Sequence, residues 1–386
     1  SNGCSATATF TVRAAPSITS TTLEVCEDGS LTLTATPAGG TWTSSAGSIA
    51  TTSTTATSST AVFTSTSGGT TPTVTYTKGG VSDQVTVTVL APPTISPSTA
   101  VTVCIGDEVT LTGSGTANAT TPWASSNTSI ATVSNGVVTG VAAGSTTITY
   151  RNNKGCTVEK SVTVHGSPSV VISGSTSICE GENVTLTSTN MSSYNWSTGA
   201  TTQSITVSPT TTTSYTLTGT DVNGCENTDL FTVTVNELPS VSVASGSATL
   251  CAGETVTLSS TVTGGTWSSD NNGVATVSST GVVTAKSVSS QSTAVITFTS
   301  TSPANCTGSI TVTVNPELTI SGTLSATVGG NQPTLLINGS ATASASSWSS
   351  SDQSVATVDA TTAGKIVPVA AGTTTITYTD PTTSCQ

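Results

Sequence analysis

The chain has 386 residues, of which only 7% are charged and 4% aromatic, and its net charge of −12 reflects seven basic against nineteen acidic residues. This length exceeds what one hydrophobic core serves, so several domains are expected. The scarcity of Lys and Arg argues against a nucleic-acid partner, because phosphate binding needs clustered basic side chains. No segment has sustained helical periodicity or eighteen unbroken apolar residues, so we expect neither a helix of consequence nor a membrane span.

One motif returns along the chain: a cysteine and a glycine turn, followed by a strand in which apolar and hydroxyl residues alternate. The clearest copy is 102–112, and the others lie at Cys26, Cys179 and Cys251, with a copy lacking cysteine at Val328. Prolines recur with spacings of 71 to 77 residues, at Pro16, Pro93, Pro168, Pro239 and Pro316. A fixed period with proline at each junction predicts tandem domains on short, restricted linkers.

This period sets the expected domain boundaries. Residues 1–14 resemble the segments that follow Cys225 and Cys306, so we interpret them as the last strand of a preceding domain, and the chain as a fragment of something longer. Five domains follow, here named repeats 1 to 5, and we expect the fifth to lack its final strand. Their ranges are 15–91, 92–166, 167–237, 238–315 and 316–386.

Repeat 2 shows the strand pattern best. Its hairpin crosses the turn signal Ser134-Asn-Gly136. Short runs of alternating residues elsewhere in the repeat predict about seven strands in all. The expected strands are 94–96, 109–112, one through Trp123, 130–133, 137–139, 146–150 and 162–164. Many short strands at this spacing indicate a β-sandwich.

Each repeat has one tryptophan at the same place in this pattern, namely Trp42, Trp123, Trp196, Trp267 and Trp348. A strand farther along each repeat carries a second aromatic residue, namely Tyr76, Tyr150, Tyr215, Phe298 and Tyr378. An exposed platform for sugars would more often cluster two or three aromatic residues. We therefore predict that the tryptophans pack in the domain cores.

A family resemblance rests on the run from Trp123-Ala-Ser-Ser through Ile130-Ala-Thr-Val to Gly144-Ser-Thr-Thr-Ile-Thr-Tyr. It resembles bacterial Ig-like group 2 domains, and the segments that begin at Trp267 and Trp348 repeat it. Repeat 3, with Trp196-Ser-Thr-Gly-Ala-Thr-Thr, is closer to the Ig-like or PKD-like modules of large Bacteroidetes surface proteins.

The resemblance implies an all-β fold of tandem Ig-like β-sandwich domains in an extended rod. It also implies the repeat region of a giant adhesin, similar to gliding-motility adhesins exported by type IX secretion, and hence an extracellular location at a bacterial cell surface. The expected partners are neighbouring repeats of the same long chain, with surface or glycan ligands at a distal tip. No catalytic or ligand-binding residues carry over from such repeats.

Nine cysteines beside a single histidine predict disulfides in an oxidising compartment rather than metal sites. They occupy two places in the repeats. The first place, in the turn between strands A and B, holds Cys26, Cys104, Cys179 and Cys251. The second place, in the loop between strands F and G, holds Cys4, Cys156, Cys225, Cys306 and Cys385.

Three pairing schemes are open. Pairing within a repeat leaves Cys26 and Cys385 without partners in addition to Cys4. Pairing each F–G cysteine with the next A–B cysteine leaves Cys104 and Cys306 without partners. The third scheme joins each A–B turn to the F–G loop of the next repeat and leaves only Cys4 over. In an Ig-type sandwich the two places of one domain lie a strand length apart, beyond the ~7 Å Cα limit of a disulfide. We therefore predict the bonds Cys26–Cys156, Cys104–Cys225, Cys179–Cys306 and Cys251–Cys385.

Other candidate sites are discounted. A lone histidine at a domain junction, His165, cannot build a Ser–His–acid arrangement, so we predict no enzyme activity and no cofactor. Acidic residues follow the A–B cysteines, as in Asp107 and Glu108. We interpret them as turn and strand-start residues that keep the sheet edge soluble, and the alternative is that they bind calcium at the junctions.

Three functions from different classes remain. The first is a structural stalk or filament region of a surface adhesin, stiffened by inter-domain disulfides, which presents a distal adhesive tip and transmits force. The second is a donor-strand-exchanged filament subunit, in which residues 5–13 complete the last domain of a neighbour. The third is an array of glycan-binding modules.

Overall fold

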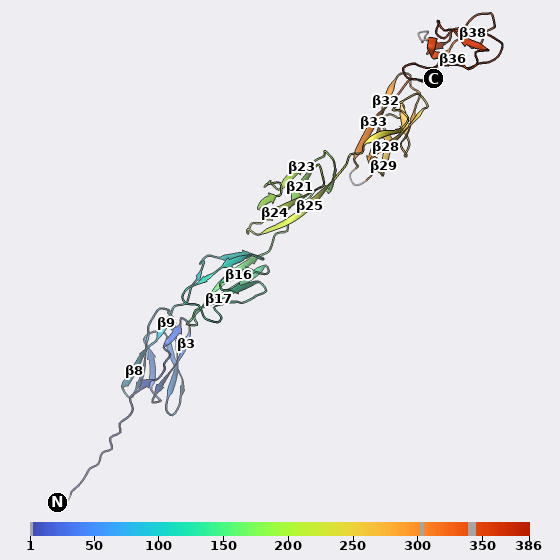
Figure 1. Cartoon of the computed structure of the whole chain (residues 1–386). Coiled ribbons are helices and arrows are strands. Elements are labelled where there is room, and N and C mark those ends of the chain that lie inside the picture. The colour runs from blue at the N-terminus through green and yellow to red at the C-terminus, as the bar shows by residue number, and fades with distance from the viewer. Residues whose placement is uncertain (1–2, 302–304, 339–344) are drawn as a thin grey trace. The chain divides into compact units, whose positions relative to one another are not determined.

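The computed structural model describes residues 3–301, 305–338 and 345–386, and strands account for every element labelled in Figure 1. Within these ranges the only helix is the short 3-10 turn η1 (Ala345–Ser347), so none is long and apolar enough to cross a membrane. The chain forms two compact units. The first runs to Val170 and adds Met191–Ser193 and Thr218–Asn227, and the second holds Val171–Asn190, Tyr194–Leu217 and Thr228–Gln386.

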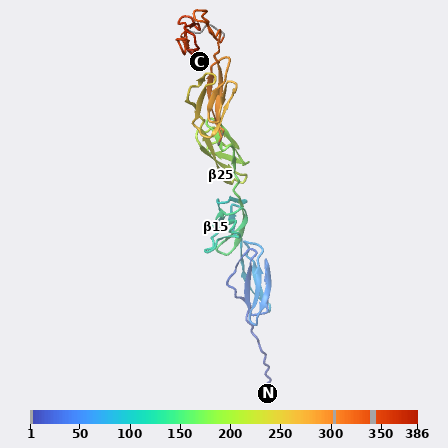
Figure 2. The same ribbon diagram turned by 90° about the vertical axis from the view of Figure 1, so that its right-hand side faces the viewer.

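Repeat 1 is a sandwich of short strands, seen at the blue end of Figure 2. The four-stranded sheet β1-β3-β6-β5 faces the three-stranded sheet β4-β7-β8, and β2 pairs with β9. The strands are β1 (Ser17–Ile18), β2 (Glu24–Cys26), β3 (Ser30–Thr36), β4 (Thr41–Ser44), β5 (Ser48–Thr54), β6 (Ser59–Thr64), β7 (Thr73–Lys78), β8 (Val81–Thr86) and β9 (Thr88–Leu90).

Repeat 2 has the sheets β11-β18-β17-β14 and β12-β16-β15 and the small pair β10-β13. Its strands are β10 (Ile95–Ser96), β11 (Val101–Cys104), β12 (Glu108–Thr110), β13 (Thr112–Gly113), β14 (Trp123–Ser125), β15 (Ala131–Ser134), β16 (Val137–Gly140), β17 (Gly144–Arg151) and β18 (Thr157–His165). The expected strand 109–112 is thus two short strands that belong to different sheets. The change of sheet occurs at Leu111, which is buried and whose amide bonds to the carbonyl of Gly136.

Repeats 3 and 4 follow the same plan. Repeat 3 has the sheets β19-β21-β23 and β20-β25-β24-β22, and repeat 4 has β26-β28-β31-β30 and β27-β33-β32-β29. The strands of repeat 3 are β19 (Ile172–Ser173), β20 (Ser177–Cys179), β21 (Val184–Ser188), β22 (Ser193–Trp196), β23 (Ser204–Val207), β24 (Thr213–Thr220) and β25 (Glu226–Asn236). Those of repeat 4 are β26 (Val241–Ser245), β27 (Thr249–Leu250), β28 (Thr255–Ser260), β29 (Gly265–Ser269), β30 (Ala275–Val277), β31 (Val282–Ala285), β32 (Ser292–Ser300) and β33 (Thr307–Val314).

Repeat 5 has three two-stranded pairs among its described residues, β34-β35, β36-β39 and β37-β38. The strands are β34 (Ile320–Ser321), β35 (Leu336–Ile337), β36 (Trp348–Ser350), β37 (Ala356–Val358), β38 (Ile366–Pro368) and β39 (Ile376–Tyr378). At the other end of the chain, residues 3–15 are exposed and form no strand. Their interpretation as the last strand of another domain stays a prediction.

The segment before the first cysteine of a repeat forms a strand, which the sequence analysis missed. We expected these cysteines in a plain A–B turn. Instead β2, β11 and β20 each end on the cysteine, β27 ends just before it, and each of these strands runs parallel to the last strand of its own repeat. The physical reason is a short alternation of residues: Val101 and Val103 point into the core, while Thr102 is exposed.

A tryptophan and a second aromatic residue lie opposite each other in four repeats; Trp42 and Trp348 are buried in the cores as predicted, whereas Trp123 and Trp267 are partly buried and pack against them. The pairs Trp42–Tyr76, Trp123–Tyr150, Trp267–Phe298 and Trp348–Tyr378 are strand partners with ring centroids 4.7, 4.7, 5.0 and 5.2 Å apart. Trp196, in repeat 3, is 2% exposed and donates from Nε1 to the carbonyl of Thr202. Tilted pairs at this distance stabilise a core beyond the area that they bury.

Glycines make room for these aromatic rings. A Cβ on Gly265 would lie 2.4 Å from both Cζ of Phe298 and the carbonyl oxygen of Thr299. We expect Gly265→Ala to lower the free energy of unfolding by about 1–3 kcal/mol through overpacking. Urea unfolding followed by circular dichroism measures this. The matched control is Gly166→Ala, whose Cβ would meet nothing closer than 3.7 Å, and equal effects of both changes would contradict the assignment.

Candidate functional site: the disulfide joints

The structure pairs eight cysteines in four disulfides, and each bond joins one repeat to the next. The bonds are Cys26–Cys156, Cys104–Cys225, Cys179–Cys306 and Cys251–Cys385, with Cα–Cα distances of 5.5, 5.6, 5.6 and 5.6 Å. These are the four pairs expected from the cysteine spacing. Cys4 is free and exposed. We call each bond, with the turn and the loop that it connects, a joint.

A tight turn follows the first cysteine of every joint. The carbonyl oxygen of Cys104 accepts the amide of Asp107 at 3.1 Å, and the same bond closes the turns after Cys26, Cys179 and Cys251. The third residue of three of these turns is a glycine with a left-handed φ of 84–87°, as at Gly106. Such a turn requires positive φ at that position, which explains the recurring glycine. In repeat 1 the position is held by Asp28, with φ 56°.

Acidic residues stabilise two of these turns directly. Oε2 of Glu182 accepts the amide of Cys179 at 2.9 Å, and Oε2 of Glu254 accepts the amide of Cys251 at 2.8 Å. The side chains therefore fold back on the turn and hold the amide of the half-cystine that begins it. No group of three or more His, Cys, Asp or Glu able to hold a metal occurs in the part of the chain that the structure describes.

The loop that carries the second cysteine is held by a side chain at its start. Oδ1 of Asn152 accepts the amide of Cys156 at 3.0 Å, and the backbone of Asn152 donates to the carbonyl of Cys156 at 3.0 Å. Asp221 makes the same two bonds to Cys225, both at 2.9 Å. These two hydrogen bonds hold the cysteine in place in addition to the disulfide.

The other two joints use variants of this loop. The hydroxyl of Ser300 accepts the amide of Cys306 at 2.9 Å, and the backbone of Asp380 donates to the carbonyl of Cys385 at 2.9 Å. The sequence analysis missed this anchoring residue. The run Asn/Asp-x-x-Gly-Cys, present at 152–156 and 221–225, is the signal that would have identified it in repeats 2 and 3.

The loop cysteine is buried in every joint, and in the Cys179–Cys306 joint the turn cysteine is buried as well, at 5% exposed. Cys156, Cys225, Cys306 and Cys385 are 2%, 0%, 2% and 3% exposed, whereas Cys26, Cys104 and Cys251 are half-buried. Thiol–disulfide exchange requires a thiolate to reach a sulfur, so burial of one sulfur limits attack to the other. Exchange at a joint must therefore occur at the cysteine of the turn.

Hydrogen bonds hold the pKa of Asp221 below its usual value, with the amide of Cys225 as the main cause and Asn223 and the charge of His165 as further causes. A carboxylate whose pKa is lower in the folded state than in the unfolded state stabilises the fold at pH values above its unfolded-state pKa. This stabilisation is lost as the pH falls through its folded-state pKa. In the matched variant Asp221→Asn the loop keeps its acceptor, as Asn152 shows in repeat 2, but loses the charge. We expect the stability difference between wild type and Asp221→Asn to shrink below about pH 4. Urea midpoints at pH 7, 5 and 3 test this, and a constant difference would contradict it.

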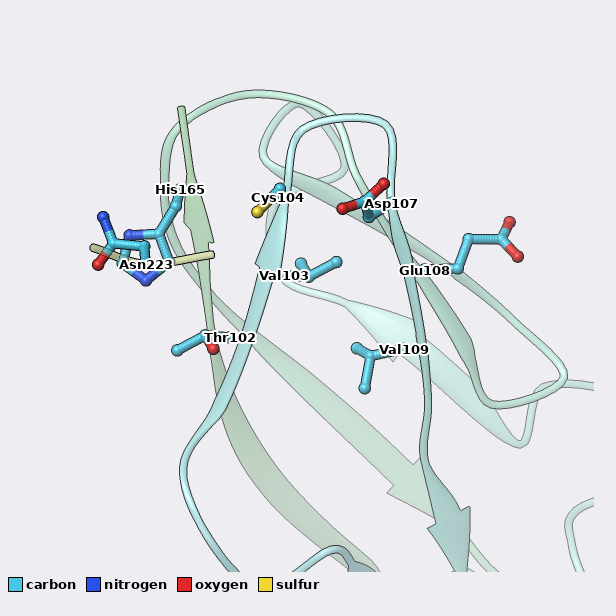
Figure 3. A pocket seen from close by; sticks show the side chains of 8 residues that line it. All are labelled: Thr102, Val103, Cys104, Asp107, Glu108, Val109, His165 and Asn223. Carbon is cyan, nitrogen blue, oxygen red and sulfur yellow. The ribbon is translucent and has the colours of Figure 1, made fainter. Parts of the chain in front are cut away.

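A hollow of about 230 Å³ lies beside the Cys104–Cys225 bond. Figure 3 shows Thr102 and Cys104 on the strand that leads into the turn, Asp107 near the turn, and Glu108 pointing away from Cys104. His165, the expected junction histidine, lines the hollow and is the strand partner of Cys104. His165 therefore lies at the joint between repeats 2 and 3.

One ion pair accompanies the Cys26–Cys156 bond. Nζ of Lys154, in the loop of repeat 2, lies 2.7 Å from Oε2 of Glu24, which begins β2 in repeat 1. Both side chains are about half exposed. Exposed pairs of this kind contribute at most about 1 kcal/mol, so the disulfide dominates this joint.

Comparisons with known proteins agree with this architecture. Residues 91–164, nearly all of repeat 2, match the family described as "Bacterial Ig-like domain (group 2)", which confirms the resemblance for that repeat. The family match covers repeat 2, and repeats 1, 3 and 4 share its plan of facing sheets of short strands. No curated protein gives a match to it.

Three solved structures illustrate the likeness. The N-terminal eight Ig domains of Down Syndrome Cell Adhesion Molecule match at 10% identity over 78% of this chain and 49% of their own, with a TM-score of 0.30. Invasin, a bacterial integrin-binding protein, matches at 15% identity over 80% and 81%, with a TM-score of 0.28. An intimin fragment, in complex with its receptor domain, matches at 19% identity over 42% and 69%, with a TM-score of 0.31. This chain thus spans about half of the first structure, and at these TM-scores none carries an argument about function.

Four disulfides in Ig-like repeats indicate an oxidising, extracellular compartment, because cytosolic thiols are kept reduced.

Proposed function

We propose that these repeats are a structural stalk of an extracellular adhesin, in which disulfides stiffen the joints between domains. The observation that carries this proposal is the joint itself: every one of the four bonds connects one repeat to the next. A short linker between two domains normally leaves them free to move relative to each other. A second covalent tie beside that linker restricts bending and swivelling.

The construction of the joints supports a mechanical purpose. Each bond connects the end of the strand that pairs with the last strand of one repeat to a hydrogen-bonded loop of the next, as in Cys104 on β11 and Cys225 after β24. Both attachment points are thus part of the hydrogen-bonded framework of their domains. Tension that reaches one sandwich passes to the next without a flexible segment.

In this proposal the array is an extended rod with the boundaries given for repeats 1 to 5, at a bacterial cell surface, and it holds a distal adhesive tip. The finer form is the repeat region of a gliding-motility adhesin exported by type IX secretion. Its support is the resemblance of repeat 3 to modules of large Bacteroidetes surface proteins. Surface or glycan ligands would bind that tip rather than the repeats.

The stiffness is tested by electron microscopy of single molecules, comparing wild type with the double variant Cys104→Ala, Cys225→Ala. We expect a narrow spread of angles at this joint in the wild type and a broad spread in the variant. Cys4→Ala, which removes the free cysteine, is the matched control and should behave as wild type. Equal spreads in all three proteins would rule out the stalk mechanism.

A further inference from the structure

The four disulfides overlap along the sequence. The loop closed by Cys26–Cys156 ends beyond Cys104, where the next loop begins, and the same overlap recurs at each later joint. Every peptide bond between Cys26 and Cys385 therefore lies inside at least one disulfide-closed loop. The segments 104–156, 179–225 and 251–306 lie inside two.

From this overlap we infer that the array stays one covalent molecule after hydrolysis of any single peptide bond between Cys26 and Cys385. A protease that cuts there adds one water and leaves two chain pieces, and at least one disulfide still connects them. Pairing within each repeat would not have this property, because it would leave the linkers and all of repeat 1 outside any loop. The chain stays connected after a cut because each disulfide joins a cysteine of one repeat to a cysteine of the next.

The exposed turns show why this matters for an extracellular chain. Gly79 and Gly80, between β7 and β8, are exposed and have left-handed φ, and Gly199 lies in another exposed turn. Exposed loop tips are the preferred sites of proteolytic nicking. A cut at Gly79 lies inside one disulfide-closed loop, and a cut at Gly199 lies inside two.

Burial of the loop cysteines limits how the loops can be opened after a cut. Cys156 is 2% exposed and Cys225 is fully buried, so a thiolate can reach these two bonds only at the half-buried Cys26 and Cys104. The inference does not depend on the stalk proposal. It concerns tolerance of proteolysis, and it would hold for any function of the array.

The test places one recognition site for a sequence-specific protease in the full chain, either between Gly79 and Gly80, or at Gly199, or after Arg13. After complete cleavage, denaturing gels without reductant should show one species for the first two sites and two pieces with reductant. The Arg13 site lies outside every loop, so its pieces should separate even without reductant. Release of two pieces from the Gly79 site without reductant would overturn the inference.

Matched cysteine variants identify the bonds involved. With the Gly79 site, Cys26→Ala with Cys156→Ala should release the pieces without reductant, whereas Cys104→Ala with Cys225→Ala should not. With the Gly199 site, neither the Cys104–Cys225 nor the Cys179–Cys306 pair alone should release them, but removal of both should.

Discussion

Stretched between its two ends with the disulfides intact, the chain is expected to stop extending at a small fraction of its contour length. Reduced, Cys26 and Cys385 are 359 residue steps apart (385 − 26). In the oxidised protein, the shortest covalent route from Cys26 to Cys385 crosses three disulfides and only 78 residue steps. Of these, 52 lie between Cys156 and Cys104 and 26 between Cys225 and Cys251. At ~3.5 Å per residue, these limits are about 1,250 Å and about 270 Å.

Single-molecule force spectroscopy measures this limit directly, with handles at the termini that add the same length to both states. Within-repeat pairing would give an intermediate value, because the route would then follow 206 steps and extend to about 720 Å. An oxidised limit near that value, or one equal to the reduced limit, would contradict the joints described here. Cys4→Ala again serves as the control, and its limit should match that of the wild type.

Removal of one joint is expected to lower the free energy of unfolding by about 3–5 kcal/mol, because the bond closes a loop of more than one hundred residues in the unfolded chain. The suitable variant is Cys104→Ala with Cys225→Ala, whose sequence separation is 121. Alanine is chosen because Cys225 is fully buried, and serine would place an unpaired hydroxyl there. Urea unfolding under oxidising conditions gives the measurement.

The same measurement with reductant separates the bond from the packing of the cysteine side chains. Reduced wild type and reduced variant should unfold at nearly the same urea concentration, because neither then has this cross-link. A large remaining difference would mean that side-chain packing causes the loss. An oxidised variant as stable as the oxidised wild type would show that the joint contributes nothing to stability.

Much of the architecture can be predicted from the sequence because the same residue types recur at equivalent positions in each repeat. The tryptophans and their partner aromatic residues recur at fixed places, and the structure pairs Trp123 with Tyr150 across neighbouring strands. The cysteine scheme follows from counting, since only the offset pairing uses all but Cys4. The all-β class follows from alternation of Thr and Val in short segments.

Other features depend on contacts that periodicity does not encode. Strand β11 is only four residues long, and its parallel pairing with β18 depends on where two distant segments meet. The loop anchors Asn152 and Asp221 act through side-chain bonds to a backbone amide four residues on, which leave no hydrophobic pattern. Asp28 takes a turn position that glycine holds in the other repeats, so a glycine pattern alone does not find it.

The central claim, that disulfides connect successive repeats, is tested most directly by mass spectrometry of peptides from the unreduced protein. Cleavage after acidic residues separates the cysteines, because Glu182 lies between Cys179 and Cys225 and Glu237 lies between Cys225 and Cys251. The account predicts linked peptides that contain Cys104 with Cys225 and Cys179 with Cys306. Peptides that link Cys104 with Cys156 and Cys179 with Cys225 would contradict it and would leave independent domains on proline linkers.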